Sequence, residues 1–400
     1  MSRRHRINRS AYSARRTYKA RPHPLFVLFM IIGFVALVLF GFLIYEPVSN
    51  AIMNWGESGT GILPSLPFPG SGEGETPPEA QQPEEGGLSA AAVGGGGLRG
   101  VWAPSGLVQN PQAFEQFVAS LPGAGLNAVM VDIKDGGGNI LFESGDSDAI
   151  AFGAVVEDAF DLAALTARLA DDGIYLIARM GAFSDEVAAR GDTNLAVAFQ
   201  QPGMLWLDNY AAAGGRPWLN PNSPDARDYL TRLAVEATRL GASLVVVDDL
   251  RFPPNSLANA HFGDMAGGRV GVLSGFVDEI TAAVEQAGGR LAVYMPAIFL
   301  ADDTPNQTFF GGWPGDILGN TTVLGALPQQ FPAGGFSSEN LTLEAPAQDT
   351  MGTLSQIAEF GLEHLEGELI LLIGGGADYI TPQAELLLSL GIEEFILFGG

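Results

Sequence analysis

The sequence predicts an α/β domain of the (β/α)8 barrel class over residues 99–400. Eight short apolar runs recur in this region and alternate with segments of helical periodicity. Several runs end directly in charged residues, as buried parallel strands do where they reach a polar site. Eight such units over about 300 residues match the size of a (β/α)8 barrel, also called a TIM barrel. An open, doubly wound sheet is the alternative.

Residues 1–24 form a basic tail, with eight of the 20 basic residues of the chain and none of its 45 acidic ones. Residues 25–45 carry no charge and are long enough, at 1.5 Å per residue, to cross a bilayer core of about 30 Å as a transmembrane helix. The positive charge before this span and Glu46 after it predict a cytoplasmic N-terminus and an extracytoplasmic C-terminal domain in the cell membrane. A cleaved signal peptide, with Ser49 and Ala51 at the cleavage site, is the alternative.

Residues 46–98 are rich in Pro, Gly and Glu and end in four glycines and a leucine. Such a segment buries too little apolar surface to offset the entropy of ordering, which predicts a disordered linker. Beyond the basic tail, 45 acidic residues face 12 basic ones, a formal net charge of −33. This balance argues against nucleic acid as a partner, since phosphate binding needs a basic surface. The absence of cysteine excludes disulfides and thiol catalysis.

The eight predicted strands are residues 100–103, 128–133, 174–180, 244–248, 291–295, 322–327, 369–373 and 395–398. Three helix starts are predicted from a capping residue followed by proline, at Asn110-Pro111, Ser223-Pro224 and Thr381-Pro382. Two segments depart from the alternation. Residues 183–222 form a long excursion after the third strand, and residues 299–321 contain no clear helix. Long insertions after strands are common in functional barrels, because the active-site loops lie there.

The carboxyl ends of the strands would face one shared mouth, and charged or aromatic residues occur at most of these ends. The candidate catalytic carboxylates are Asp132, Asp135, Asp248 and Asp249. The candidate substrate-binding residues are Trp102, Lys134, Arg179, Trp218, Arg251 and Tyr294. Other polar residues near strand ends are Asp302, Asp303, Asp378 and Tyr379.

Clustered carboxylates with basic neighbours suit glycoside hydrolysis, in which one carboxylate is the general acid and another the nucleophile or base. A buried ion-pair network at the barrel end is the alternative for each of them. Lys134 is the sole lysine after residue 19, and either a structural salt bridge or a substrate contact would explain it. Asp248 and Asp249 would point to opposite faces of a continuing strand, so only one can face the barrel interior.

We predict neither a metal nor a cofactor. The aspartates are oxygen ligands of the kind that Mg²⁺ or Ca²⁺ prefers, but no EF-hand spacing is present. His261 and His364 are isolated, which argues against zinc. The glycine runs after the second and seventh strands match no phosphate-binding motif and suit turns better. Aromatic residues in the excursions could stack on sugars or pack beneath the loops; they are Trp206, Tyr210, Trp218 and Trp313.

Five segments in order resemble the bacterial glycoside hydrolase-like domain family, envelope proteins with a predicted TIM barrel. They are Arg99-Gly-Val-Trp, Leu126-Asn-Ala-Val-Met-Val-Asp-Ile-Lys-Asp, Gly173-Ile-Tyr-Leu-Ile-Ala-Arg, Trp218-Leu-Asn-Pro and Val247-Asp-Asp-Leu-Arg-Phe-Pro. The resemblance covers residues 99–253 well and the remainder loosely. It places the family's motif residues on Asn127, Asp132, Lys134, Asp135, Arg179, Asp248 and Arg251.

The chain departs from the family pattern at several strand ends. Asp249 stands where a tyrosine is usual, and the family's strand-six Pro-Met-x-Tyr motif is not evident near residues 326–332. The tryptophan-containing ends of strands seven and eight are replaced by Ile373-Gly-Gly-Gly and Leu397-Phe-Gly-Gly.

Together with the predicted transmembrane helix, the resemblance implies a membrane-anchored glycoside hydrolase acting on an envelope or environmental polysaccharide, with Asp248 as nucleophile or base. The second carboxylate is open among Asp132, Asp135, Asp249 and Asp302. The departures favour the alternative of a barrel that binds glycan without turnover, and a structural envelope barrel is a third possibility.

Overall fold

The computed structural model describes residues 97–254, 257, 259–302, 306–374 and 377–398. The predicted tail, transmembrane span and nearly all of the linker lie outside these residues. In the part that is described, no helix is both long and apolar enough to cross a membrane.

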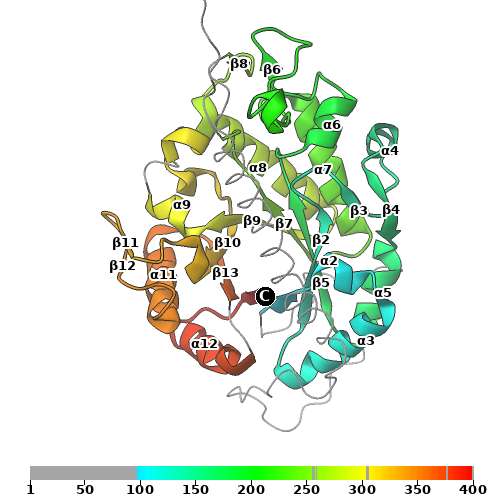
Figure 1. Cartoon of the computed structure of the whole chain (residues 1–400). Helices are drawn as coiled ribbons and strands as arrows, with labels where there is room; N and C mark the ends of the chain where they lie inside the picture. The colour runs from blue at the N-terminus through cyan, green and yellow to red at the C-terminus, as the bar shows by residue number, and fades with distance from the viewer. Residues whose placement is uncertain (1–96, 255–256, 258, 303–305, 375–376, 399–400) are drawn as a thin grey trace, which may run out of the picture. The chain divides into compact units, whose positions relative to one another are not determined.

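Eight parallel strands close into a barrel, which appears at the centre of Figure 1. In barrel order they are β1 (Arg99–Trp102), β2 (Ala128–Lys134), β5 (Tyr175–Gly181), β7 (Leu244–Asp248), β9 (Arg290–Pro296), β10 (Thr321–Ala326), β13 (Glu368–Gly374) and β14 (Phe395–Phe398). The pairing of β14 with β1 closes the ring. The barrel and all eight predicted strands are confirmed, and the open sheet is wrong.

Helices cover the outside of the barrel. They are α2 (Ser105–Val108), α3 (Pro111–Ser120), α5 (Leu162–Asp171), α7 (Pro224–Arg239), α8 (Gly268–Gln286), α11 (Thr350–His364) and α12 (Ala377–Ser389), with the 3-10 turn η2 (Pro122–Ala124). Asn110 and Ser223 cap α3 and α7 as predicted, by accepting hydrogen bonds from Ala113 N and Ala226 N. The start predicted at Thr381 is wrong, because α12 begins at Ala377 and includes Pro382. Pro382 lies inside the helix, where it removes one backbone hydrogen bond and its ring crowds the carbonyl four residues earlier.

Strand alternation divides the apolar core into two layers. One cluster consists of strand residues and their immediate neighbours alone, among them Met130, Ile177 and Val246, and it fills the barrel. The larger cluster lies between the strands and the helices, where Val272, Phe276 and Ile280 form the buried stripe of α8. At the amino-terminal end of the barrel, an ion-pair network closes the interior.

That closing network centres on Arg290, which binds Glu368 at 2.7 Å and Glu394 at 3.1 Å. The polar residues at the other end of the same strands therefore project from a packed interior.

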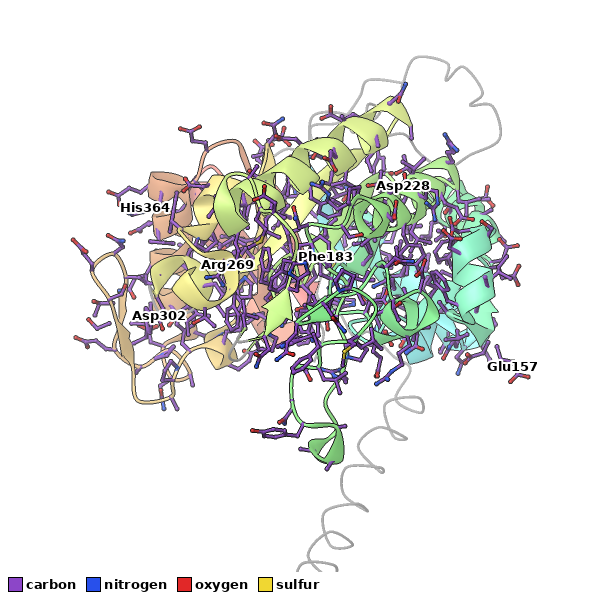
Figure 2. All side chains as sticks on the ribbon, turned by 90° about the horizontal axis from the view of Figure 1, so that it is seen from above. Glu157, Phe183, Asp228, Arg269, Asp302 and His364 are labelled. Carbon is purple, nitrogen blue, oxygen red and sulfur yellow. The ribbon has the colours of Figure 1, made fainter. Side chains whose placement is uncertain are left out.

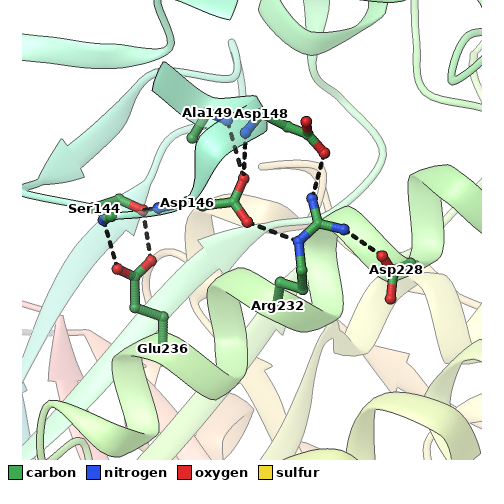
Figure 3. A network of polar contacts seen from close by, with 8 residues as sticks. Ser144, Asp146, Asp148, Ala149, Asp228, Arg232 and Glu236 are labelled. Atoms are coloured by element: carbon green, nitrogen blue, oxygen red, sulfur yellow. Dashed lines mark hydrogen bonds and ion pairs between the residues drawn. The ribbon is translucent and has the colours of Figure 1, made fainter. Parts of the chain in front are cut away.

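An insertion follows β2 and extends the sheet beyond the barrel. It comprises β3 (Ile140–Phe142), α4 (Ser147–Phe152) and β4 (Val155–Phe160). Figure 3 shows how it docks on α7: Arg232 binds Asp146 and Asp148 of the insertion as well as Asp228 of its own helix, while Glu236 accepts hydrogen bonds from Ser144 Oγ and Gly145 N.

Further insertions surround the carboxyl end of the barrel. The excursion after β5 contains α6 (Glu186–Gly191), β6 (Ala198–Phe199) and the 3-10 turn η3 (Ala211–Ala213), and β6 pairs with β8 (Ala260–His261) from the loop after β7. Between β9 and β10 the described residues form only the short elements α9 (Ala297–Ala301), η4 (Asn306–Phe310) and η5 (Pro314–Ile317). The segment after β10 contains η6 (Pro328–Gln330), β11 (Phe336–Ser337) and β12 (Thr342–Leu343).

Candidate active site

Three charged side chains from neighbouring strands meet at the carboxyl end of the barrel. Asp132, Arg179 and Asp248 each lie two residues beyond a barrel-filling residue of β2, β5 or β7, so all three share the inward face. Arg179 lies between the two carboxylates. Its Nη1 donates to Asp132 Oδ1 at 2.7 Å, and its Nη2 donates to Asp248 Oδ2. The three side chains are 20%, 19% and 16% exposed, which makes this a partly open cluster.

Aromatic rings border this cluster. The guanidinium carbon of Arg179 lies 4.3 Å from the centroid of the Trp102 ring, and Trp102 packs edge-on against Phe398. From β9, Tyr294 belongs to the barrel-facing set, and Gln330 Nε2 donates to its hydroxyl oxygen at 2.7 Å. Trp102 and Tyr294, which were both predicted to lie at this mouth, thus border the charged cluster.

Burial and charge set the proton affinities of this cluster. Burial raises the pKa of Asp248; the positive charge of Arg179 opposes this shift, and the neighbouring Asp249 adds to it. Burial disfavours the charge of Arg179, but Asp248 and Asp132 outweigh it, so the pKa of Arg179 is raised. Burial, with the negative charge of Asp248, raises the pKa of Tyr294 to about 12. Tyr294 is therefore a hydrogen-bond donor at neutral pH.

The two carboxylates differ in their remaining contacts. Asp248 Oδ1 accepts a hydrogen bond from Asp249 N at 2.6 Å, so both oxygens of Asp248 are engaged. Asp132 Oδ2 accepts no hydrogen bond from any residue that the structure describes. Asp132 therefore has an oxygen available to a ligand in the mouth.

Asp249 and Arg251 form a second cluster. Asp249 adopts a left-handed backbone with a φ of 50°, which turns the chain directly after β7. Its Oδ1 accepts from Arg251 Nε at 3.1 Å and Nη2 at 2.9 Å. The guanidinium of Arg251 lies 5.1 Å from the ring centroids of both Trp218 and Phe309. Asp249 thus pairs with Arg251, while Asp248 pairs with Arg179.

Lys134 and Asp135 stabilise loops. Lys134 Nζ lies 3.0 Å from Asp185 Oδ2 and donates to Gly181 O at 2.8 Å, and both partners of this ion pair are almost fully buried. Asp135 Oδ1 accepts from Gly137 N and Asn139 N, which closes the turn after β2. Neither side chain joins the Asp132–Arg179–Asp248 cluster. Of the two explanations left open for Lys134, the structure shows the salt bridge.

The aromatic residues of the excursions divide by burial. Trp206 and Trp218 are buried, and Trp218 Nε1 donates to Asp208 Oδ2 at 3.1 Å. Trp313 is half-buried and donates to Leu300 O, whereas Tyr210 is exposed. The predicted contact of Trp218 with substrate would need its buried ring to become accessible.

The remaining candidates from the sequence have no described contact with the cluster of Asp132, Arg179 and Asp248. Asp302 follows α9, while Asp303 and the side chains of Asp378 and Tyr379 lie outside what is described. No group of three or more His, Cys, Asp or Glu side chains among the described residues is arranged to hold a metal ion. Gln330 was not predicted, because its contact with Tyr294 joins residues 36 positions apart and has no local sequence signal.

A closed (β/α)8 barrel with carboxylates and an arginine at its carboxyl-end mouth has the architecture of a barrel enzyme. Residues 100–307 match the family described as "Putative glycosyl hydrolase domain", and the chain belongs to this family. This confirms the family to which the sequence motifs pointed.

Several solved structures are similar to this chain. A hypothetical protein from Ruminiclostridium thermocellum is 26% identical and covers 48% of this chain and 96% of its own, with a TM-score of 0.41. The glycoside hydrolase domain of PgaB (BpsB) from Bordetella bronchiseptica is 14% identical and covers 76% of this chain and 94% of its own, with a TM-score of 0.48. The glycoside hydrolase domain of PelA from Pseudomonas aeruginosa is 11% identical and covers 76% of this chain and 94% of its own, with a TM-score of 0.37. No curated protein matches the chain.

Proposed function

We propose that this chain is a glycoside hydrolase that cleaves an envelope or environmental polysaccharide outside the cell. The observation that carries the proposal is the pair of inward carboxylates, Asp132 and Asp248, bridged by Arg179 at an aromatic-lined barrel mouth. Two carboxylates that flank a glycosidic bond are the usual catalytic requirement of such hydrolysis.

In this proposal Asp248 is the general acid and Asp132 is the nucleophile or base. The raised pKa of Asp248 suits a group that must donate a proton to the departing sugar oxygen. Asp132 has an oxygen free of hydrogen bonds from described residues, which suits attack on the anomeric carbon or on the proton of a water molecule. This reverses the role first predicted for Asp248. Arg179 would hold both carboxylates in place.

The distance between the two carboxyl groups in the complex with substrate determines the stereochemistry. Separations of about 5–5.5 Å allow direct attack and retention, whereas about 6.5–9.5 Å leaves room for water and gives inversion. Proton NMR of the first-formed anomer distinguishes the two outcomes.

The purified full chain should release reducing ends from at least one member of a panel of chitin, chitosan, cellulose, xylan, mannan and peptidoglycan sacculi. Asp248→Asn and Asp132→Asn should each lower kcat by about 10²–10⁴-fold, the usual contribution of one acid or base. Asp158→Asn, on the exposed edge strand β4, is the matched control and should keep full activity. Unchanged turnover in Asp248→Asn would remove the basis of the assignment.

A binding module without turnover is the second candidate. It is favoured by the full engagement of Asp248, whose two oxygens accept hydrogen bonds from Arg179 and Asp249 N as in a structural ion pair. Retention of a polysaccharide from the same panel without release of reducing ends would support this candidate and exclude hydrolysis.

The location of the domain is part of the proposal and rests on the sequence alone. Residues 25–45 would anchor the chain in the membrane, and residues 46–98 would hold the barrel outside. Protease added to intact cells should then digest the barrel, or its linker, without lysis. Protection of the barrel until the cells are opened would contradict this orientation.

A further inference from the structure

Residues 208–216, here called the arm, project from the excursion between β6 and α7. Asp208 N donates to Arg216 O at 3.0 Å, which closes the base of the arm. The turn η3 lies at its tip. In Figure 2 this green segment extends beyond the rest of the described domain.

The arm has a defined internal structure. Asp208 Oδ1 accepts from Arg216 N at 2.7 Å, and its Oδ2 accepts from the buried Trp218 Nε1 at 3.1 Å. Ala213 N donates to Tyr210 O at 2.8 Å. A Cβ atom on Gly215 would lie 2.0 Å from Asn209 O, so the two sides of the arm touch through a glycine. These contacts fix the backbone that carries Tyr210.

The tip of the arm presents apolar groups to solvent. Tyr210 is 84% exposed, and the three alanines that follow it are exposed as well. Residues 209–215 contain no charged side chain. Met204, in the same excursion, is also exposed, so two of the four exposed large hydrophobic side chains among the described residues lie here. A tyrosine combines a flat apolar ring with a polar hydroxyl, which suits a contact surface that stays partly wet.

Contacts connect the arm to the candidate active site. Trp218, which holds Asp208, lies beneath the guanidinium of Arg251. Arg251 binds Asp249, the residue next to Asp248. The base of the arm is therefore connected to Arg251 and Asp249, which directly follow β7 and the catalytic candidate Asp248.

We propose that the arm is a second glycan-binding site, at which the Tyr210 ring stacks on a sugar ring of the polysaccharide whose reacting bond occupies the mouth. This inference rests on the proposed function. The flat, weakly polar faces of pyranose rings match an exposed tyrosine ring. An uncharged or cationic chain is the substrate class that fits, because the strongly negative domain repels polyanions. The arm would increase affinity for long chains and leave short fragments unaffected.

Tyr210→Ala in the full chain tests the proposal, with Ile150→Ala on α4 as the matched control. Ile150 is an exposed hydrophobic residue, 60% accessible, on the insertion after β2. Retention on chitin, cellulose, xylan and mannan is measured in the Asp248→Asn background, and hydrolysis of polymer and trisaccharide in the active background. Tyr210→Ala should weaken polymer binding about five- to tenfold and raise KM by a similar factor, with kcat and trisaccharide hydrolysis unchanged. Tyr210→Trp should keep full affinity, whereas Tyr210→Leu should not.

Several results would overturn the proposal. Polymer binding by Tyr210→Ala equal to that of Ile150→Ala, or full affinity in Tyr210→Leu, would show that no ring stacks there. Equal losses on polymer and trisaccharide would place the effect in the mouth. If the parent chain cleaves polysaccharide and Tyr210→Ala behaves like it, only this inference fails. If the parent chain neither binds nor cleaves any polysaccharide of the panel, the proposed function fails as well.

Discussion

Lys134→Met is expected to destabilise the barrel severely, because it removes one partner of a fully buried ion pair. Lys134 and Asp185 are 1% and 0% exposed, and their charged atoms lie 3.0 Å apart. Asp185 Oδ2 has no hydrogen bond within the described structure, so the ion pair with Lys134 compensates this oxygen, while Oδ1 accepts from Ala188 N. Leaving a buried charge without its partner costs about 3–5 kcal/mol. The variant also leaves Gly181 O without the donor that now lies at 2.8 Å, which places the loss toward the upper end.

Urea denaturation of the full chain measures this loss in free energy of unfolding. At about 2 °C per kcal/mol for a domain of this size, the melting temperature should fall by about 6–10 °C. Asp185→Asn is the reciprocal variant, because asparagine can still accept from Ala188 N and cap α6. The double variant removes both charges and should lose about 1–3 kcal/mol less than the sum of the two single variants. A loss below about 1 kcal/mol for Lys134→Met, or strict additivity, would refute the reasoning.

Three further predictions concern the same face of the barrel and its insertion. Asp248→Asn should raise the free energy of unfolding at pH 7 by about 0.5–2 kcal/mol. The raised pKa of Asp248 means that the folded state favours the protonated carboxyl group. The stability that protonation contributes is fully present below the ordinary pKa of 3.8 and is lost as pH rises, whereas asparagine stays uncharged. Calorimetry at several pH values should show the advantage of the variant shrinking toward pH 4, and an advantage that grows on acidification would contradict it. Gly138→Ala should lower the free energy of unfolding, measured by urea denaturation, by about 2–4 kcal/mol. The φ angle of Gly138 is 99°, and the new Cβ atom would lie 2.0 Å from Asp185 Oδ1. An unchanged free energy of unfolding would mean that this loop shifts freely. Arg232→Met should speed hydrogen exchange in β3, α4 and β4 while changing global stability by only about 1 kcal/mol, since Arg232 is 37% exposed. Unchanged exchange there would show that the Glu236 contacts hold the insertion alone.

The barrel could be predicted from the sequence because the strands of the barrel are buried on both faces. Residues 369–373 are an uninterrupted apolar run, and residues 244–248 are an apolar run that ends in a single carboxylate. This pattern predicts a parallel strand without any knowledge of its neighbours. The helix start at Thr381 could not be placed by the same local rules. A cap followed by proline is a preference worth about 1 kcal/mol, and tertiary packing can override it.

The candidate site was only partly predictable because its members depend on pairings between distant strands. Alternation from Met130, Ile177 and Val246 leads to Asp132, Arg179 and Asp248, so the inward cluster follows once the barrel is assumed. The partner of Lys134 is different. Asp185 follows β5 by a few residues, and nothing in its local sequence distinguishes a buried ion pair from a helix cap, a role that it also has.

The role of Asp248 illustrates what strand position alone cannot decide. Position places Asp248 at the mouth, and a nearby arginine suggests an ionised carboxylate that acts as nucleophile or base. The structure adds burial and the neighbouring Asp249, which together outweigh Arg179 and raise the pKa of Asp248. The chain turns at Asp249 with a left-handed backbone, so this second carboxylate lies directly after the strand and pairs with Arg251. The departure from the family's usual tyrosine thus brings a charge that favours a proton-donating Asp248. Asp249→Tyr should therefore lower the pKa of Asp248 and shift the alkaline limb of the pH–activity profile toward lower pH. An unshifted limb would mean that burial alone sets the proton affinity of Asp248.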